Sequence, residues 1–154
     1  THHKASTVYA LSSGHGTCGV SVIRITGALA GRALMAMTST SKLPPPRHAQ
    51  LKKLIHPIHK EFLTGFDTLV SETEDKVATS FILIFVLYEI ILQVSPPKSF
   101  TGEDSSEFQV HGGHAVVKAV LSAISSLPGL QPAQPGDFTK RAFQNGKLDL
   151  LQVE

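Results

Sequence analysis

The stretch Ser99–His114 gathers several residue types that could bind a small molecule. It opens with a turn-forming cluster that contains two acidic residues, continues as a short alternating strand that carries Glu107, and ends at His111–His114, where an apolar helical pattern starts. A carboxylate on the edge of a rigid strand, beside the N-terminus of a helix, is a common arrangement in sites for polar ligands. We therefore predict a binding site for a polar small molecule here.

Arg24 is a second candidate, because it interrupts the strand pattern Val20–Ile25, which is otherwise apolar or hydroxyl-bearing. Arginine is rarely buried without a partner. If its side chain faces a cleft, the guanidinium can hold a carboxylate or a carbonyl through two parallel hydrogen bonds. A structural salt bridge is an equally good interpretation. Glu107 and Lys147, taken alone, are most simply interpreted as surface charges.

Other candidate sites have simpler explanations. The glycine-rich loop Gly14–Gly19 is followed by a strand pattern, whereas a phosphate-binding loop precedes a helix, so we predict a hairpin loop. Cys18 has no feature of an activated nucleophile. His111 and His114 are three residues apart, but a third ligand with suitable spacing is missing, which favours structural or capping roles over metal binding. We predict no catalytic residue and no metal ligand.

Hydrophobic periodicity predicts the elements that must position these residues. The order of elements predicts an α+β domain with two layers, a mixed β-sheet covered by helices. The predicted strands are Thr7–Leu11, Val20–Ile25, His48–His56, a strand through Glu107–Val110, and Leu130–Ala133. The predicted helices are Ala28–Met37, His114–Leu127 and Asp137–Gln144.

The run Phe81–Leu92 is apolar except for Glu89. It is shorter than the roughly 20 apolar residues that a membrane-spanning helix requires. A buried pair of strands, or a poorly ordered insert, is therefore a better interpretation than a membrane span, and membrane contact is not expected.

The composition limits the classes of function. The 154 residues, 42% of them hydrophobic and 17% charged, suit one globular domain. The net charge of +2 and the scattered lysines and arginines do not favour direct nucleic-acid binding. A single cysteine excludes an intrachain disulfide. The chain has no initiator methionine or signal-peptide pattern and stops within a helical pattern, so we expect a fragment of a longer protein.

Four blocks of the sequence resemble, in order, the N-terminal domain of the MnmE/TrmE family of tRNA-modification GTPases, and most closely its mitochondrial branch. The blocks are Thr7–Gly27, with IRITG at its end, Leu43–Ala49 (LPPPRHA), Ser99–Val117 (SFTGEDSSEFQVHGGHAVV) and Pro135–Glu154 (PGDFTKRAFQNGKLDLLQVE). The resemblance implies a fold like the folate-binding part of one-carbon enzymes. It also implies homodimerisation and a bound 5-formyl- or 5,10-methylene-tetrahydrofolate.

The resemblance further implies a role in modifying C5 of the wobble uridine of tRNA, to taurinomethyluridine in mitochondria. In that family the domain works with an FAD-dependent partner of the MnmG (GidA) type, and tRNA is bound by the full complex. GTP, Mg²⁺ and K⁺ belong to a GTPase domain whose motifs are absent here, so we expect no GTP hydrolysis by this chain alone. The implied location is the mitochondrial matrix, or the cytoplasm for a bacterial protein.

Carried over position by position, the family's folate contacts fall on Arg24, Glu107 and Lys147. A carboxylate such as Glu107 can accept the paired N–H donors of a pterin's amino-pyrimidinone edge. Arg24 and Lys147 could meet carbonyl or carboxylate oxygens of the ligand. This division of roles is a hypothesis.

Domain boundaries follow from the same comparison of motifs. Residues 1–147 are expected to form the folate-binding and dimerisation domain, and 148–154 to begin a following helical domain. Residues 71–95 depart from the family pattern as an atypical insert, which could displace the strand before the site. His114 stands where the family has proline, with little expected effect. Two alternatives stay open: a stand-alone folate enzyme of the aminomethyltransferase type, and a dimerisation module with a damaged folate site.

Overall fold

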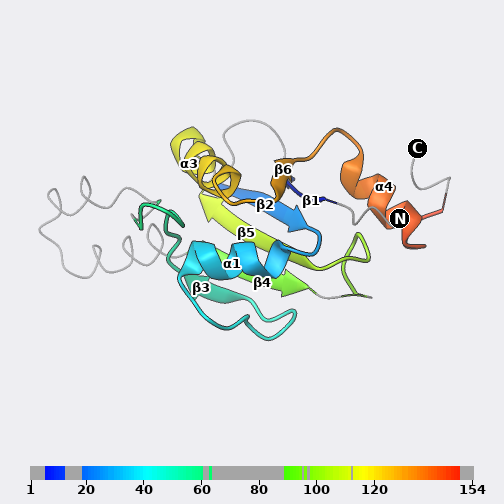
Figure 1. Ribbon diagram of the computed structural model, residues 1–154, viewed down its shortest axis with the longest axis horizontal. Coiled ribbons are helices and arrows are strands. Elements are labelled where there is room, and N and C mark those ends of the chain that lie inside the picture. The colour runs from blue at the N-terminus through cyan, green and yellow to red at the C-terminus, as the bar shows by residue number, and fades with distance from the viewer. Residues whose placement is uncertain are drawn as a thin grey trace, which may run out of the picture.

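Six strands form one sheet in the order β3-β4-β5-β2-β1-β6 (Figure 1). The computed structural model describes residues 6–12, 19–60, 63, 89–94, 96, 98–111 and 113–149. The strands are β1 (Thr7–Leu11), β2 (Val20–Thr26), β3 (Gln50–Lys52), β4 (Glu89–Val94), β5 (Ser105–His111) and β6 (Leu130–Pro132). All neighbouring pairs are antiparallel except β1 and β6, which are parallel, so the sheet is mixed.

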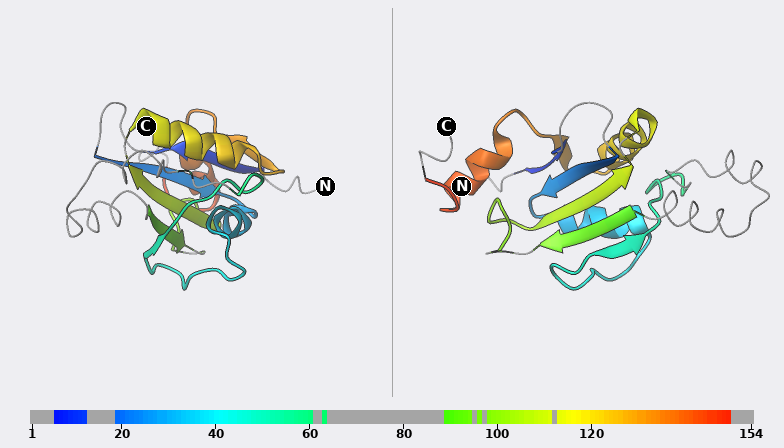
Figure 2. Two further views of the ribbon diagram at one scale, coloured as in Figure 1. Left: turned by 90° about the vertical axis from the view of Figure 1, so that its left-hand side faces the viewer. Right: turned by 180° about the vertical axis from the view of Figure 1, so that it is seen from behind.

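Two helices cover a single face of this sheet. They are α1 (Ala30–Thr38) and α3 (His114–Ser125), which lie in front of the strands in Figure 1 and behind them in the right-hand view of Figure 2. A third helix, α4 (Asp137–Gln144), lies at one end of the sheet beside the loop that precedes β5. The predicted two-layer α+β fold is confirmed. The order of the described elements matches the prediction except at β4 (Glu89–Val94), a single strand where the sequence predicts a buried pair of strands or a poorly ordered insert.

The core lies between the sheet and the two helices. Ile23, Ile25 and Phe108 are fully buried on the helix-facing side of the sheet. The helices contribute further buried side chains from one stripe each: Ala33, Leu34 and Met37 from α1, and Val120, Ala123 and Ile124 from α3. Tyr9 joins this core, and its burial raises the pKa of the phenol above the usual value, although a hydrogen bond with Ser125 opposes the shift.

The alternation along β2 and β5 sends the remaining side chains to the opposite face, where described helices do not cover the sheet. Val22 and Arg24 point to this side and are partly exposed, while Val20 at the start of the strand is 52% exposed. Leu51 of β3, which is 55% exposed, lies in the same row across the sheet as Val22. We call this side the open face.

The predicted strand His48–His56 is observed only as Gln50–Lys52. The chain leaves the sheet after Lys52 because Leu54 turns into the core, where it is fully buried. The amide N–H of Ile55 then bonds to the carbonyl oxygen of Met37, at the end of α1. Burial of one leucine beneath the helix therefore outweighs continuation of an edge strand.

Part of the atypical segment 71–95 belongs to the sheet. Residues 89–94 form β4, which pairs with β5 in the register Ile91 to Phe108 and with β3 on its other side. The strand that precedes the site is therefore present next to β5. Most of the run Phe81–Leu92 lies outside the described residues. Within the described part of the chain, no helix is both long and apolar enough to cross a membrane.

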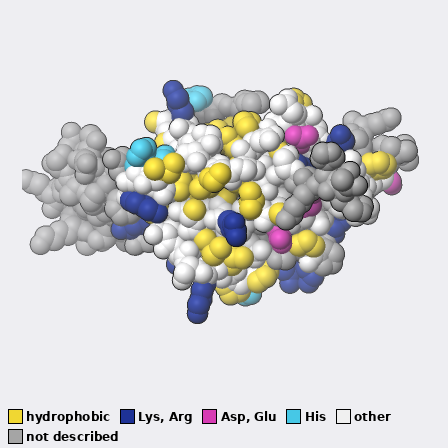
Figure 3. All heavy atoms as spheres, in the orientation of Figure 1, with side chains coloured by type: hydrophobic (Ala, Val, Ile, Leu, Met, Phe, Trp, Pro, Cys, Tyr) yellow, Lys and Arg dark blue, Asp and Glu magenta, His cyan; other side chains and the backbone are white. Residues whose placement is uncertain are grey.

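Charge is distributed without a basic stripe on the visible, helix-covered face. Lysine and arginine side chains are spread from end to end, and the acidic side chains lie towards the end that carries α4 (Figure 3). This pattern agrees with the small net charge of +2.

Candidate functional site

Arg24 and Glu107 form an ion pair across two neighbouring strands. The register of β2 and β5 places the two residues directly opposite each other on the open face. The Nη2 atom of Arg24 donates to Oε2 of Glu107 over 3.2 Å, although the residues are 83 positions apart in the chain. Their side chains remain 30% and 20% exposed, so both groups are accessible from solvent.

The second carboxylate oxygen of Glu107 is also engaged. Nε2 of Gln109, two residues further along β5, donates to Oε1 over 3.3 Å. Each carboxylate oxygen can accept two hydrogen bonds. The two contacts therefore hold the carboxylate in one orientation and leave acceptor positions for a ligand.

A small cavity of about 100 Å³ adjoins this ion pair. Among the described residues, its charged lining consists of Arg24, Glu107 and Lys98, and the other lining residues are Ser99, Phe100, Ser105 and Ser106. The turn before β5 therefore supplies most of one wall, and the centre of the sheet supplies the other.

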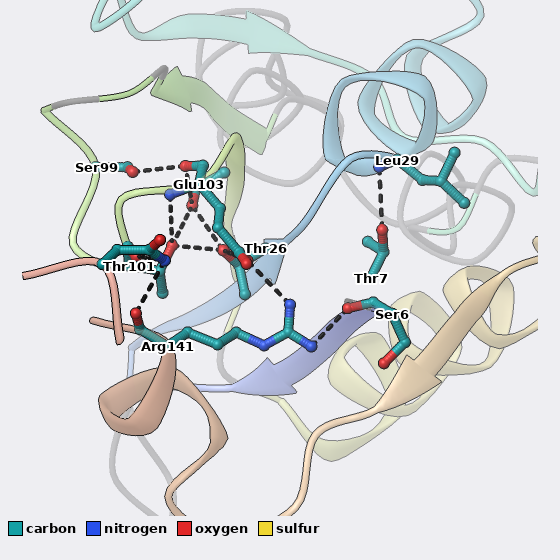
Figure 4. Close-up of polar contacts among 10 residues, drawn as sticks. Ser6, Thr7, Thr26, Leu29, Ser99, Thr101, Glu103 and Arg141 are labelled. Atoms are coloured by element: carbon teal, nitrogen blue, oxygen red, sulfur yellow. Dashed lines mark hydrogen bonds and ion pairs between the residues drawn. The ribbon is translucent and has the colours of Figure 1, made fainter. Parts of the chain in front are cut away.

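A buried polar network supports that turn from below (Figure 4). The hydroxyl of Thr26, at the end of β2, lies 2.6 Å from that of Thr101 and 3.1 Å from that of Ser105. Ser99 donates from its hydroxyl to the carbonyl oxygen of Glu103. These contacts fix the turn against the end of β2, and two of the residues that make them, Ser99 and Ser105, also line the cavity.

Arg141 of α4 closes the network. Its Nη1 donates to Oε2 of Glu103 over 2.9 Å, and its Nη2 donates to the carbonyl oxygen of Ser6. Glu103 is one of the two acidic residues of the turn-forming cluster predicted from the sequence, and in the structure it also forms this ion pair. Sequence reasoning missed Arg141, which is only 9% exposed, because an arginine in a short polar helix normally faces solvent.

The structure does not place Lys147 in the lining of the cavity beside Arg24 and Glu107. It is exposed, follows the end of α4, and is not among the described residues that line the cavity. Its backbone N–H bonds to the carbonyl oxygen of Ala142 over 2.8 Å. Asn145, two residues earlier, donates through Nδ2 to the carbonyl oxygen of Thr101. This bond connects the end of α4 to the turn before β5, residues 99–104, which we call the site turn.

The other sequence candidates contribute little to this site. His114 is the first residue of α3, as the pattern predicts. Cys18 and most of the glycine-rich loop lie outside the described residues. Within the ranges that the structure describes, no group of three or more metal-ligating side chains comes together.

Comparison with known proteins defines the class of this domain. Residues 7–147 match the family model described as "GTP-binding protein TrmE N-terminus". The chain therefore belongs to the TrmE N-terminal domain family of tRNA-modification GTPases.

Similar proteins come from both mitochondria and bacteria. The chain is 45% identical, over 96% of its length, to the mitochondrial 5-taurinomethyluridine-[tRNA] synthase subunit GTPB3 of Danio rerio, and 45% identical over 97% of its length to that of Homo sapiens. It is 41% identical over 96% of its length to the tRNA modification GTPase MnmE of Parvibaculum lavamentivorans. The matched region is 25%, 26% and 28% of these relatives, so the chain spans about a quarter of their length.

Proposed function

We propose that this domain binds a reduced folate, 5-formyl- or 5,10-methylene-tetrahydrofolate, at Arg24, Glu107 and Lys147, and serves in tRNA modification as a homodimer. The observation that carries the proposal is the accessible, cross-strand pair of Arg24 and Glu107 beside a cavity, in a chain of the TrmE N-terminal family. The folate, when bound, would supply a one-carbon unit for C5 of the wobble uridine.

The donor and acceptor set of the cavity suits one end of a folate. The amino-pyrimidinone edge of a pterin carries adjacent N–H donors, which match the free acceptor positions of Glu107. The Arg24 guanidinium has five N–H groups, and one of them donates to Glu107. Other N–H groups are therefore available for a carbonyl oxygen of the ligand. Lys147 would have to reach the ligand from the end of α4, where the bond between Asn145 and Thr101 holds the helix close to the turn.

The open face supports the proposal of a homodimer. Val20 and Leu51 are large apolar side chains that are more than half exposed there. Val22 follows Val20 by two residues on β2 and shares a row across the sheet with Leu51, through Gln109 and Ile90. Exposed apolar patches on one side of a sheet commonly mark an interaction surface. A second copy of the domain, which offers the same apolar surface, is the partner we propose, because a twofold interface is self-complementary.

The folate proposal is tested by titrating the purified chain with 5-formyl-tetrahydrofolate in a calorimeter. We expect Glu107→Ala to lower the affinity about tenfold or more, because a charged acceptor of ligand N–H groups is lost. Asp104→Asn is the matched control, since it removes an exposed carboxylate three residues away that does not line the cavity. Equal affinities of the parent and Glu107→Ala would contradict the assignment.

Two further measurements separate the alternatives. Failure of the parent chain to bind any reduced folate, with dimerisation retained, would favour a dimerisation module with a damaged site. Co-purification of the full-length protein with an FAD-dependent MnmG-type partner, and loss of wobble-uridine modification when the gene is deleted, would favour the tRNA role over a stand-alone folate enzyme. The location, in mitochondria or in a bacterial cytoplasm, follows from the source of the gene.

A further inference from the structure

The charges around the cavity do not balance. Arg24 and Glu107 neutralise each other at 3.2 Å, and Lys98 is the third charged residue of the lining. Within the described residues, the Lys98 ammonium makes no hydrogen bond or ion pair. Among the lining residues that the structure describes, one positive charge is therefore uncompensated, which favours a ligand with an anionic group.

Glu103, an acidic residue of the turn, is already engaged and cannot easily supply that missing partner. Glu103 is held by Arg141 at 2.9 Å and by the hydroxyl of Thr26. Its carboxylate is therefore committed to the buried network beneath the turn. A ligand anion would meet little competition for Lys98 from this carboxylate.

The backbone that carries Lys98 is fixed, while its side chain is exposed. Ser99, the next residue, is buried, and its hydroxyl bonds to the carbonyl oxygen of Glu103. The amide N–H of Gly102 bonds back to the carbonyl oxygen of Ser99 over 3.3 Å. The lysine therefore starts from a defined point at the rim of the cavity and can reach outwards.

The size of the cavity decides which part of a ligand meets Lys98. Drug-sized ligands occupy pockets of about 300–1,000 Å³. The observed cavity of about 100 Å³ is too small for a whole folate and suits only the edge of its pterin. The aminobenzoyl and glutamate parts would extend over the rim, where Phe100 is 48% exposed and Lys98 is exposed.

We propose that Lys98 binds the glutamate carboxylates of the folate and makes the site prefer folates with longer glutamate tails. This inference rests on the proposed folate site, but it assigns a specificity role to a residue outside the set of Arg24, Glu107 and Lys147. Each added glutamate brings another carboxylate near an ammonium group, which raises the local attraction at low ionic strength.

The test compares three probes on the parent chain and on Lys98→Gln: 5-formyl-tetrahydrofolate with one glutamate, the same folate with three glutamates, and a tetrahydropterin without a tail. We expect the parent to bind the triglutamate best. Lys98→Gln should lose about three- to fivefold in affinity for the triglutamate, as for an exposed ion pair, and change little for the tetrahydropterin. High salt should reduce the preference of the parent in the same way.

Two controls keep the result specific. Lys98→Arg should keep the preference for the tail, because it keeps the positive charge. Lys118→Gln, which removes an exposed lysine of α3 on another surface, should bind all three probes as the parent does.

The outcomes distinguish this inference from the function on which it rests. An unchanged triglutamate affinity in Lys98→Gln, or an equal loss for all three probes, would overturn the role of Lys98 while the folate site stands. Failure of the parent to bind any of the probes would overturn both.

Discussion

Arg141 shows how a single side chain can support a site that it does not touch. The guanidinium bonds to Glu103 in the site turn and to the carbonyl oxygen of Ser6 before β1. It therefore joins α4, the turn and the N-terminal strand through one buried group.

We predict that Arg141→Met lowers the free energy of unfolding by about 2 kcal/mol, because Glu103 and the Ser6 carbonyl lose charge-assisted hydrogen bonds in a largely buried place. Urea denaturation followed by circular dichroism measures the change. Lys140→Met, at the exposed neighbouring position of α4, is the control and should change stability by less than about 0.5 kcal/mol. Similar stabilities for the two variants would show that the network contributes little.

At the scale of elements, the turn between β2 and α1 depends on Gly27. Its backbone φ is 130°, a value that residues with a side chain rarely adopt. A Cβ atom at this position would lie 2.7 Å from the Cα atom of Thr7. The amide N–H of Gly27 bonds to the carbonyl oxygen of Asp104 over 2.9 Å. The glycine therefore brings β1, β2 and the site turn into close contact.

Gly27→Ala should destabilise the domain by about 2–4 kcal/mol, since it adds both backbone strain and a clash with backbone atoms that cannot easily move. Thermal unfolding by calorimetry would report this as a lower Tm. Gly19→Ala is the control, because a Cβ atom at that position meets no described atom within 4 Å. A Gly27→Ala variant as stable as the Gly19→Ala variant would contradict the geometry of the turn.

At the scale of the whole molecule, the proposed homodimer would form through the open face, which the described helices do not cover. We predict that the parent chain sediments as a dimer in analytical ultracentrifugation and that Leu51→Asp sediments as a monomer, because a charge would be desolvated at the interface. The substitution should leave the fold intact, since Leu51 is 55% exposed in the monomer.

Ile58→Asp is the matched control for this experiment. Ile58 is 61% exposed but lies outside the strands, so its replacement should leave the dimer unchanged. A monomeric parent, or equal loss of the dimer in both variants, would argue against the open face as the interface.

Local patterns in the sequence predict most of the fold, because the periods of strands and helices are set by neighbouring residues. The helix Asp137–Gln144 is predicted to the residue, since Asp137 favours its start and Asn145-Gly146 its end. The strand His48–His56 is predicted too long, because the burial of Leu54 is a tertiary effect. Such packing between distant residues cannot be detected in the local alternation of apolar and polar residues.

The site is only partly predictable for the same reason. Arg24 and Glu107 are candidates from residue type and position, and resemblance to a family adds a ligand, but their direct pairing depends on the register of two strands 83 residues apart. The burial of Arg141 and the uncompensated charge of Lys98 depend on which elements meet in space. Nothing in the residues beside them distinguishes these two cations from ordinary surface charges.

Under the proposed folate function, the opposition of Arg24 and Glu107 also makes ligand binding an assay of correct strand alignment. Successive side chains of a strand alternate between its two faces, so a slip of β2 by one residue against β5 would send Arg24 towards the helices while Glu107 stayed on the open side. A folding product with a slipped strand could keep its secondary structure and still fail to bind folate. Titrated binding capacity would therefore count the correctly aligned molecules in a refolded preparation, which circular dichroism alone would not do.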